Sequence, residues 1–289
     1  MQVDLLAGTV YAPTVMPRRA PTILVFDSGL GGLTVFAEVL KARPEARFVY
    51  AADDAGFPYA RLSEPALVAR VVAVMARLVD LHAPDLVVVA CNTASTIVLE
   101  ALRKRFTVPF VGTVPAIKPA AAISRTRRIS VLATPGTVAR EYTRDLVATY
   151  AGDCRVTLVG APRLAALAEA ELAGAPGADA EIAAEIAPCF VGEVEPRTDV
   201  VALACTHYPL LLPRLRALAP WDVTWLDPAP AIARRVVQLL GASARDEEAD
   251  EDATAVFTSG AGVNGALRDA LAARGLARVE VEAVPFASA

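Results

Sequence analysis

Short apolar runs alternate with longer amphipathic segments along most of the chain. The runs are rich in Val, Leu and Ala and are apolar throughout, which predicts strands of parallel sheets covered on both faces. Strands are expected at 22–27, 47–52, 85–90, 109–113, 128–133, 155–159, 199–204 and 222–226, with two more near 254–259 and 278–284. Helices are expected between them, among them 65–81, 137–150, 179–191 and 229–240. This alternation predicts an α/β fold with right-handed crossovers.

The length and composition exclude several classes of protein. A chain of 289 residues has room for roughly two domains. Hydrophobic residues make up 55% and charged residues 21%, which argues against a disordered chain or a disulfide-stapled miniprotein. The net charge of −4 and the lack of a basic stripe argue against a nucleic-acid partner. The acidic run at 246–252 is expected to be a solvated loop.

The sequence favours a cytoplasmic protein. No uncharged run reaches about 18 residues, so no transmembrane helix and no membrane partner are expected. Residues 1–20 lack the charge pattern of a signal peptide and are interpreted as an N-terminal extension.

The cysteines point to neither a disulfide framework nor a metal centre. They are scattered, without Cys-x-x-Cys spacing, at Cys91, Cys154, Cys189 and Cys205. With only two histidines, His82 and His207, a histidine-built metal site is not expected. Cys154 and Cys189 have no chemical groups near them in the sequence and are interpreted as small buried hydrophobic residues.

Polar residues follow three of the expected strands, where open α/β sheets bind ligands. They are Asp27-Ser28, Cys91-Asn92-Thr93 and Cys205-Thr206-His207. The last two groups resemble each other, because each follows an Asp, an apolar run and an Ala. This weak internal repeat predicts that two facing halves of the molecule direct both thiols into one cleft.

The position of each thiol suggests chemistry. Cys91 is expected between a strand and the N-terminus of a helix, where the helix dipole lowers a thiol pKa. Cys205 repeats that arrangement, with His207 as a proton partner. Two uses remain open: a nucleophile with a resolving thiol, or an acid and a base on opposite faces of one substrate carbon. The second explains the duplication better.

Other polar positions have both structural and functional interpretations. Asp27 is either a turn cap or part of the site. The glycines at 29, 31 and 32 could hold a phosphate or carboxylate through backbone N–H groups, although they match neither the dinucleotide-binding nor the Walker pattern. His82 is expected at a helix C-terminus, favourable to the dipole and without a chemical role.

Four motifs together resemble those of bacterial glutamate racemases. They are Phe-Asp-Ser-Gly-Leu-Gly-Gly-Leu-Thr-Val at 26–35, Pro-Tyr at 58–59, Ala-Cys-Asn-Thr-Ala at 90–94 and Cys-Thr-His-Tyr-Pro-Leu at 205–210. Val-Pro-Ala-Ile-Lys-Pro-Ala at 114–120 also fits, and the resemblance runs from about residue 21 to at least 240.

The resemblance implies two pseudo-symmetric three-layer domains with mainly parallel sheets and an active site in the cleft between them. One domain would comprise 21–113 plus 226–289 and the other 114–225. The implied activity is a cofactor-independent, two-base interconversion of L- and D-glutamate that supplies D-glutamate for peptidoglycan. Oligomeric state stays open, with a homodimer as one option, and so does activation by a peptidoglycan precursor.

The resemblance also implies residue roles. Cys91 would deprotonate D-glutamate with help from Asp27, and Cys205 would deprotonate L-glutamate with help from His207. Glu169 matches a family glutamate near the second cysteine, although the usual proline of that motif is absent. Substrate contacts are expected from Asp27, Ser28, Tyr59, Ala60, Asn92, Thr93, Thr206 and His207. Ala60 replaces a family glycine, which would strain the loop if the backbone there needed a positive φ.

Rival functions fit the sequence less well. An aspartate racemase, a hydantoin racemase or a maleate isomerase of the same fold would also use two cysteines, but the Pro-Tyr and Cys-Thr-His-Tyr-Pro motifs favour glutamate. A cysteine phosphatase would need an arginine six residues after Cys91, and an aspartyl-phosphate phosphatase a second Asp where Gly29 stands. A non-catalytic ligand-binding regulator would not need both thiols.

Overall fold

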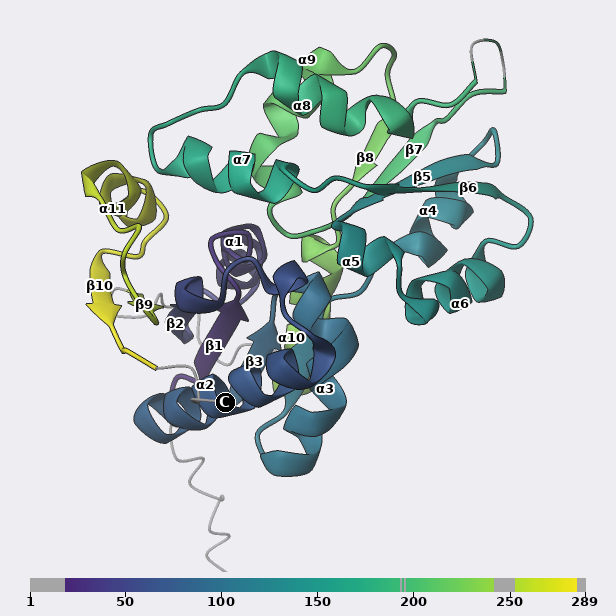
Figure 1. The fold of residues 1–289 in the computed structure, drawn as a ribbon. Helices are drawn as coiled ribbons and strands as arrows, with labels where there is room; N and C mark the ends of the chain where they lie inside the picture. The colour runs from purple at the N-terminus through teal and green to yellow at the C-terminus, as the bar shows by residue number, and fades with distance from the viewer. Residues whose placement is uncertain (1–18, 193, 195, 242–252, 285–289) are drawn as a thin grey trace, which may run out of the picture.

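The computed structural model describes residues 19–192, 194, 196–241 and 253–284. The expected acidic loop at 246–252 and residues 1–18 of the expected extension lie outside them. Within these residues the strands form two sheets, and all neighbouring strands in each sheet are parallel (Figure 1). The expected α/β class with parallel sheets is confirmed.

The larger sheet has six strands in the order β10-β9-β2-β1-β3-β4, and the smaller has four in the order β6-β5-β7-β8. The strands are β1 (Thr22–Asp27), β2 (Arg47–Ala52), β3 (Leu86–Val89), β4 (Phe110–Gly112), β5 (Arg128–Ala133), β6 (Arg155–Gly160), β7 (Val200–Ala204), β8 (Thr224–Leu226), β9 (Thr254–Phe257) and β10 (Arg278–Val281). All ten expected strands are present, with ends shifted by a few residues at most.

Helices cover both faces of each sheet and make two three-layer units. The α-helices are α1 (Leu33–Ala42), α2 (Glu64–His82), α3 (Asn92–Arg105), α4 (Ile117–Ile123), α5 (Pro135–Val138), α6 (Glu141–Tyr150), α7 (Leu164–Leu172), α8 (Asp179–Ile186), α9 (Leu212–Leu218), α10 (Ala229–Leu240) and α11 (Gly265–Ala272). Short 3₁₀ helices span Asp54–Gly56, Tyr59–Arg61, Ala187–Cys189 and Tyr208–Leu211.

On the larger sheet, α1, α10 and α11 pack on one face and α2 and α3 on the other. On the smaller sheet, α7, α8 and α9 face α4 and α6 across the strands.

Two helices are shorter than the sequence predicts. The segment 137–150 breaks at Arg140, which has extended backbone, and the Thr143 hydroxyl donates to the Thr137 carbonyl (2.7 Å) across the break. The segment 179–191 ends at Ile186, because Pro188 has no N–H to continue the helix.

The internal repeat expected from the sequence is confirmed in the topology. The order β2-β1-β3-β4 in one sheet matches β6-β5-β7-β8 in the other, and Cys91 and Cys205 follow the equivalent strands β3 and β7. The Asp that begins each repeat has one structural role. Asp85 accepts the Thr22 N–H (2.8 Å) at the start of β1, and Asp199 accepts the Thr126 N–H (3.1 Å) just before β5.

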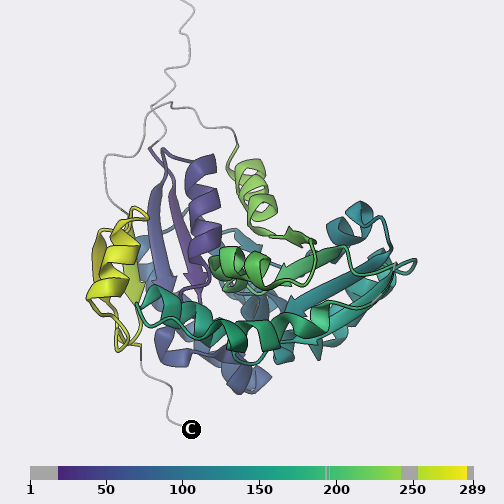
Figure 2. The same ribbon diagram turned by 90° about the horizontal axis from the view of Figure 1, so that it is seen from above.

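The C-terminal part of the described chain, 229–241 and 253–284, returns to the larger sheet. Strand β9 pairs with β2, β10 pairs with β9, and α10 packs against α1. In both views α11 lies beside the end of α7, and Asn264 Nδ2 there donates to the Ala173 carbonyl at 3.1 Å (Figures 1 and 2). Among the described residues, no helix combines the length and hydrophobicity needed to cross a bilayer.

Candidate active site

A small cavity lies between the carboxyl ends of the two sets of strands. Its lining comes from both sheets: Ser28, Phe57, Pro58, Tyr59, Ala60, Cys91, Asn92, Thr93, Thr134, Ala165, Ala204, Cys205, Thr206 and His207. Both thiols face it, one from each sheet, and each cysteine is only 6% exposed. The cavity measures about 30 Å³, which is room for roughly one water molecule. The structure therefore brings the predicted residues together in a closed arrangement.

Cys91 follows β3 and is the N-cap residue of α3, which confirms its predicted place between a strand and the N-terminus of a helix. Its Sγ accepts the Ala94 N–H at 3.5 Å and lies 3.7 Å from the Ser28 hydroxyl. The predicted lowering of its pKa is wrong. Burial raises the pKa of the Cys91 thiol, the negative charge of Asp27 raises it further, and together they outweigh the Ala94 amide.

Asp27 joins the two halves of the site at the end of β1. It is fully buried, and its Oδ1 accepts the Ser28 N–H at 2.5 Å while its Oδ2 accepts the Thr206 hydroxyl at 3.2 Å. Burial raises the pKa of Asp27, although the opposite charge of His207 and the Ser28 N–H act against this. Its link to Cys91 passes through the Ser28 hydroxyl, which also donates to Oδ1 (3.2 Å).

Cys205 is supported differently from Cys91. No α-helix begins at Cys205, so the predicted repeat of a helix N-terminus is wrong here, and a 3₁₀ helix over Tyr208–Leu211 follows instead. The Cys205 Sγ lies 3.7 Å from His207 Nδ1, and His207 Nε2 lies 2.8 Å from Glu169 Oε1. Burial lowers the pKa of His207, but the hydrogen bonds to Cys205 and Glu169, together with the negative charges of Cys205 and Asp27, raise that pKa well above its usual value.

The glycine-rich loop after β1 packs directly on this second half. Glu169 Oε1 accepts the Leu30 N–H at 2.8 Å, so the loop does hold a carboxylate, that of the chain's own Glu169. A Cβ at Gly29 would lie 1.9 Å from Glu169 Oε1, and one at Gly31 would lie 2.3 Å from His207 Nδ1. Only glycine permits this close approach.

Three further predicted residues differ in what they offer a ligand. The Asn92 amide is buried, and neither its oxygen nor its nitrogen has a partner among the described residues. The Tyr59 hydroxyl donates its proton to Asp53 at 2.6 Å, so this proton is not available to a ligand. Ala60 is not among the described residues with positive φ, so replacement of the family glycine by alanine does not strain the loop.

Thr134 belongs to the site but was missed in the sequence. It follows β5, lines the cavity and lies 3.5 Å from the Thr93 hydroxyl, oxygen to oxygen. The signal was available in the repeat, because Thr134 follows β5 as Ser28 follows β1.

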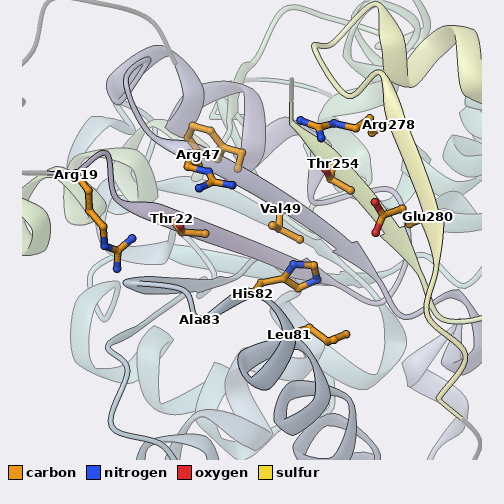
Figure 3. A pocket seen from close by; sticks show the side chains of 11 residues that line it. Arg19, Thr22, Arg47, Val49, Leu81, His82, Ala83, Thr254, Arg278 and Glu280 are labelled. Atoms are coloured by element: carbon orange, nitrogen blue, oxygen red, sulfur yellow. The ribbon is translucent and has the colours of Figure 1, made fainter. Parts of the chain in front are cut away.

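A second, larger cavity lies at the opposite, amino-terminal edge of the six-stranded sheet (Figure 3). It measures about 350 Å³ and is lined by Arg19, Thr22, Arg47, Phe48, Val49, Leu81, His82, Ala83, Thr254, Arg278 and Glu280. His82 ends α2 here as predicted, but burial lowers the pKa of its imidazole and so disfavours the cation that would interact with the helix dipole. Within the part of the chain that the structure describes, no three His, Cys, Asp or Glu side chains group to hold a metal ion.

The fold and the two thiols define a two-sheet α/β protein with a cysteine pair in the cleft. The sequence profile of the family described as Asp/Glu/Hydantoin racemase matches residues 32–236. The chain is 55% identical over 256 residues to a glutamate racemase of Brucella canis, which covers 88% of this chain and 92% of that protein. The chain belongs to the Asp/Glu/hydantoin racemase family.

Solved structures agree with this assignment. An Escherichia coli glutamate racemase, crystallised with L-glutamate and the activator UDP-MurNAc-Ala, is 39% identical with a TM-score of 0.85, covering 92% of this chain and 99% of that one. A Thermus thermophilus glutamate racemase in complex with beta-chloro-D-alanine is 26% identical with a TM-score of 0.68, covering 93% and 98%. The resemblance in the four motifs and the two-domain fold are thus confirmed.

Proposed function

We propose that this protein interconverts L- and D-glutamate by a cofactor-independent, two-base mechanism and so supplies D-glutamate for peptidoglycan synthesis. The observation that carries the proposal is the cavity itself, which receives one buried thiol from each of two topologically equivalent strands. Inversion at a carbon needs proton transfer on two opposite faces, and a thiol from each sheet meets that need.

In this mechanism each thiol acts on one enantiomer. Cys205 removes the α-proton of L-glutamate while the Cys91 thiol protonates the opposite face, and the roles reverse for D-glutamate. His207, held by Glu169, assists Cys205. Asp27 acts on the Cys91 side through Ser28.

The groups around the cavity suit a zwitterion with two carboxylates. Asn92 offers an amide without a protein partner, Thr93 and Thr206 offer hydroxyls, and the loop at 59–60 offers backbone N–H groups. The negative charge of Asp27 favours the substrate ammonium group. That ammonium would in turn oppose the effect of Asp27 on Cys91 and lower the pKa of this thiol when substrate binds.

Glutamate can enter only if the walls of the cavity separate, because the cavity has the volume of about one water molecule. Contacts that cross the cleft would break or rearrange in that step. They include the Leu30–Glu169 hydrogen bond and the ion pair between Arg140 of the smaller unit and Glu64 at the start of α2. Reclosure would exclude water and strengthen the donors around the developing negative charge.

We also infer the division into 21–113 plus 226–289 and 114–225, for which the pairing of β9 with β2 and the packing of α10 on α1 give support. We further propose a cytoplasmic location without nucleic-acid or membrane partners, which the net charge of −4 and the lack of a long uncharged run support. Sedimentation of the purified protein would distinguish a homodimer from a monomer.

The test is incubation of the purified protein with L-glutamate in D₂O without added pyridoxal phosphate. Circular dichroism should decay to zero while deuterium enters the α-position. If glutamate stays unchanged but aspartate loses its optical signal, the chemistry stands and the substrate is wrong. If neither amino acid reacts, the proposed function fails.

A further inference from the structure

A buried ion pair lies directly behind the loop that borders the cavity at 57–61. Asp53 follows β2 and is fully buried, and Arg70 of α2 is 4% exposed. The Arg70 Nε lies 3.0 Å from Asp53 Oδ2, and Nη2 lies 2.5 Å from Oδ1, so the guanidinium spans both carboxylate oxygens. Such a bidentate pair fixes direction as well as charge.

Two further donors complete the shell of the Asp53 carboxylate. The Tyr59 hydroxyl donates to Oδ2 at 2.6 Å, and the Thr258 hydroxyl donates to Oδ1 at 2.7 Å. Burial and the negative charge of Asp53 raise the pKa of Tyr59 well above its usual value, so the phenol keeps the proton that it donates. The Asp53 N–H donates to the Asp27 carbonyl at 2.9 Å, which ties this cluster to the neighbouring strand end in the site.

The returning C-terminal segment holds the residues just before this loop. Besides Thr258, the carboxylate of Asp54 accepts the Ser259 N–H at 2.7 Å and the Gly260 N–H at 2.8 Å. Arg70 also donates through Nη1 to the Val284 carbonyl. Asp53 and Arg70, the pair behind the loop, are therefore both held by residues about 200 positions later in the chain.

We propose that Asp53 and Arg70 are positioning residues for substrate binding, because they hold the Tyr59 side chain so that the backbone of residues 59 and 60 faces the cavity. This inference rests on the proposed function and adds a role for groups that line no part of the cavity. The cluster sets where a substrate carboxylate meets the loop, and Asp53 and Arg70 act on the loop from outside the cavity lining.

The predicted kinetic signature follows from this separation. Loosening the loop weakens glutamate binding, while the thiols and their partners stay in place. Misplacing a binding group by about 1 Å can cost up to about 100-fold, so KM should rise by about 10-fold to 100-fold in Y59F, R70K and D53N, with kcat changing by less than about threefold. Because enantiomers have equal free energies, kcat/KM must fall equally in both directions.

The matched control is a second buried ion pair in the same unit. Arg43 Nε donates to Glu45 Oε1 at 2.7 Å, and both side chains are as buried as those of the Asp53–Arg70 pair, but they lie at the amino-terminal end of β2. R43M should lower the midpoint of thermal unfolding, as R70K does, and leave KM and kcat at wild-type values.

The experiment measures KM and kcat from both enantiomers, the thermal midpoint, and the primary isotope effect with α-deuterated glutamate. An inactive wild type overturns the proposed function. An active wild type with unchanged KM in Y59F and R70K overturns the positioning role, and so does an equal rise of KM in R43M. If D53N does not fold, the kinetics of Y59F decide, because this variant removes only a hydroxyl.

Discussion

The two thiols occupy equivalent places in two similar sheets, yet their surroundings differ. Cys91 caps a helix, contacts a hydroxyl, and is near the buried carboxylate of Asp27. Cys205 caps no α-helix and contacts an imidazole that is itself held by Glu169. The position of each sulfur comes from the shared topology, whereas the polar side chains in contact with the sulfurs differ between the two halves.

This difference has a chemical use in the proposed reaction. A base and an acid on opposite faces must exchange roles at each turnover, and neither can be permanently ionised. Burial and Asp27 hold Cys91 in its protonated form in the closed site, and His207 offers Cys205 a proton partner within 3.7 Å. One thiol is thus prepared as the acid and the other has a group to receive its proton.

Removing either thiol should have the largest effect. C91A and C205A should each lower racemisation by at least about 1,000-fold, because each removes one of the two proton-transfer groups. Exchange of the α-proton with D₂O, measured without inversion, tests each thiol separately. C91A should still exchange L-glutamate slowly through Cys205, and C205A should exchange only D-glutamate through Cys91.

C154A is the control for these variants, because Cys154 lies after α6 and lines no part of the cavity. It should exchange and racemise as the wild type does. Exchange of both enantiomers by C91A would contradict the assignment of one thiol to each enantiomer.

Changing the partner of each thiol should have the next largest effect. D27N and H207N should each lower kcat/KM by about 100-fold. The two variants should differ in the pH dependence of Cys91 alkylation. Asp27 raises the pKa of Cys91, so D27N should lower that pKa and move the pH profile of Cys91 alkylation to lower pH, which makes alkylation at pH 8 faster.

H207N should leave the Cys91 profile unchanged, because His207 lies on the Cys205 side. Mass spectrometry of peptides alkylated by iodoacetamide across the pH range measures both profiles. Slower alkylation of Cys91 in D27N would show that Asp27 activates this thiol, the reverse of the expected electrostatic effect.

The smallest effect is expected at the position where this chain departs from its family. Ala60 needs no left-handed backbone, so A60G should change kcat/KM by less than about twofold. It should lower the free energy of unfolding by about 0.4–1 kcal/mol, because glycine adds freedom to the unfolded chain. Urea unfolding and steady-state kinetics together test this, and a large gain in activity would show that the alanine restricts the loop.

Much of the molecule follows from local patterns. The strands, the repeat and the cysteine pair could be predicted, because apolar runs mark buried strands and ligands bind at strand ends. The raised pKa of Cys91 could not be predicted. The sequence indicates the helix N-terminus, but the burial of the thiol and its proximity to the charge of Asp27 depend on the tertiary structure. The orientation of Tyr59 also could not be predicted, because its hydroxyl depends on Asp53, which is held by Arg70 and by Thr258, 205 residues away from Asp53.

The return of the chain to the larger sheet has a consequence for biosynthesis. Strand β2 receives its outer neighbour only when residues 254–257 are available, after all four strands of the smaller sheet have been made. During translation the smaller sheet can form while β2 still presents an unpaired edge, which is a template for association with other chains. The pairing of β9 with β2 joins residues far apart in the sequence, so it should occur late in folding. Nascent chains that end near residue 240 should therefore aggregate or bind chaperones more than chains that include β9.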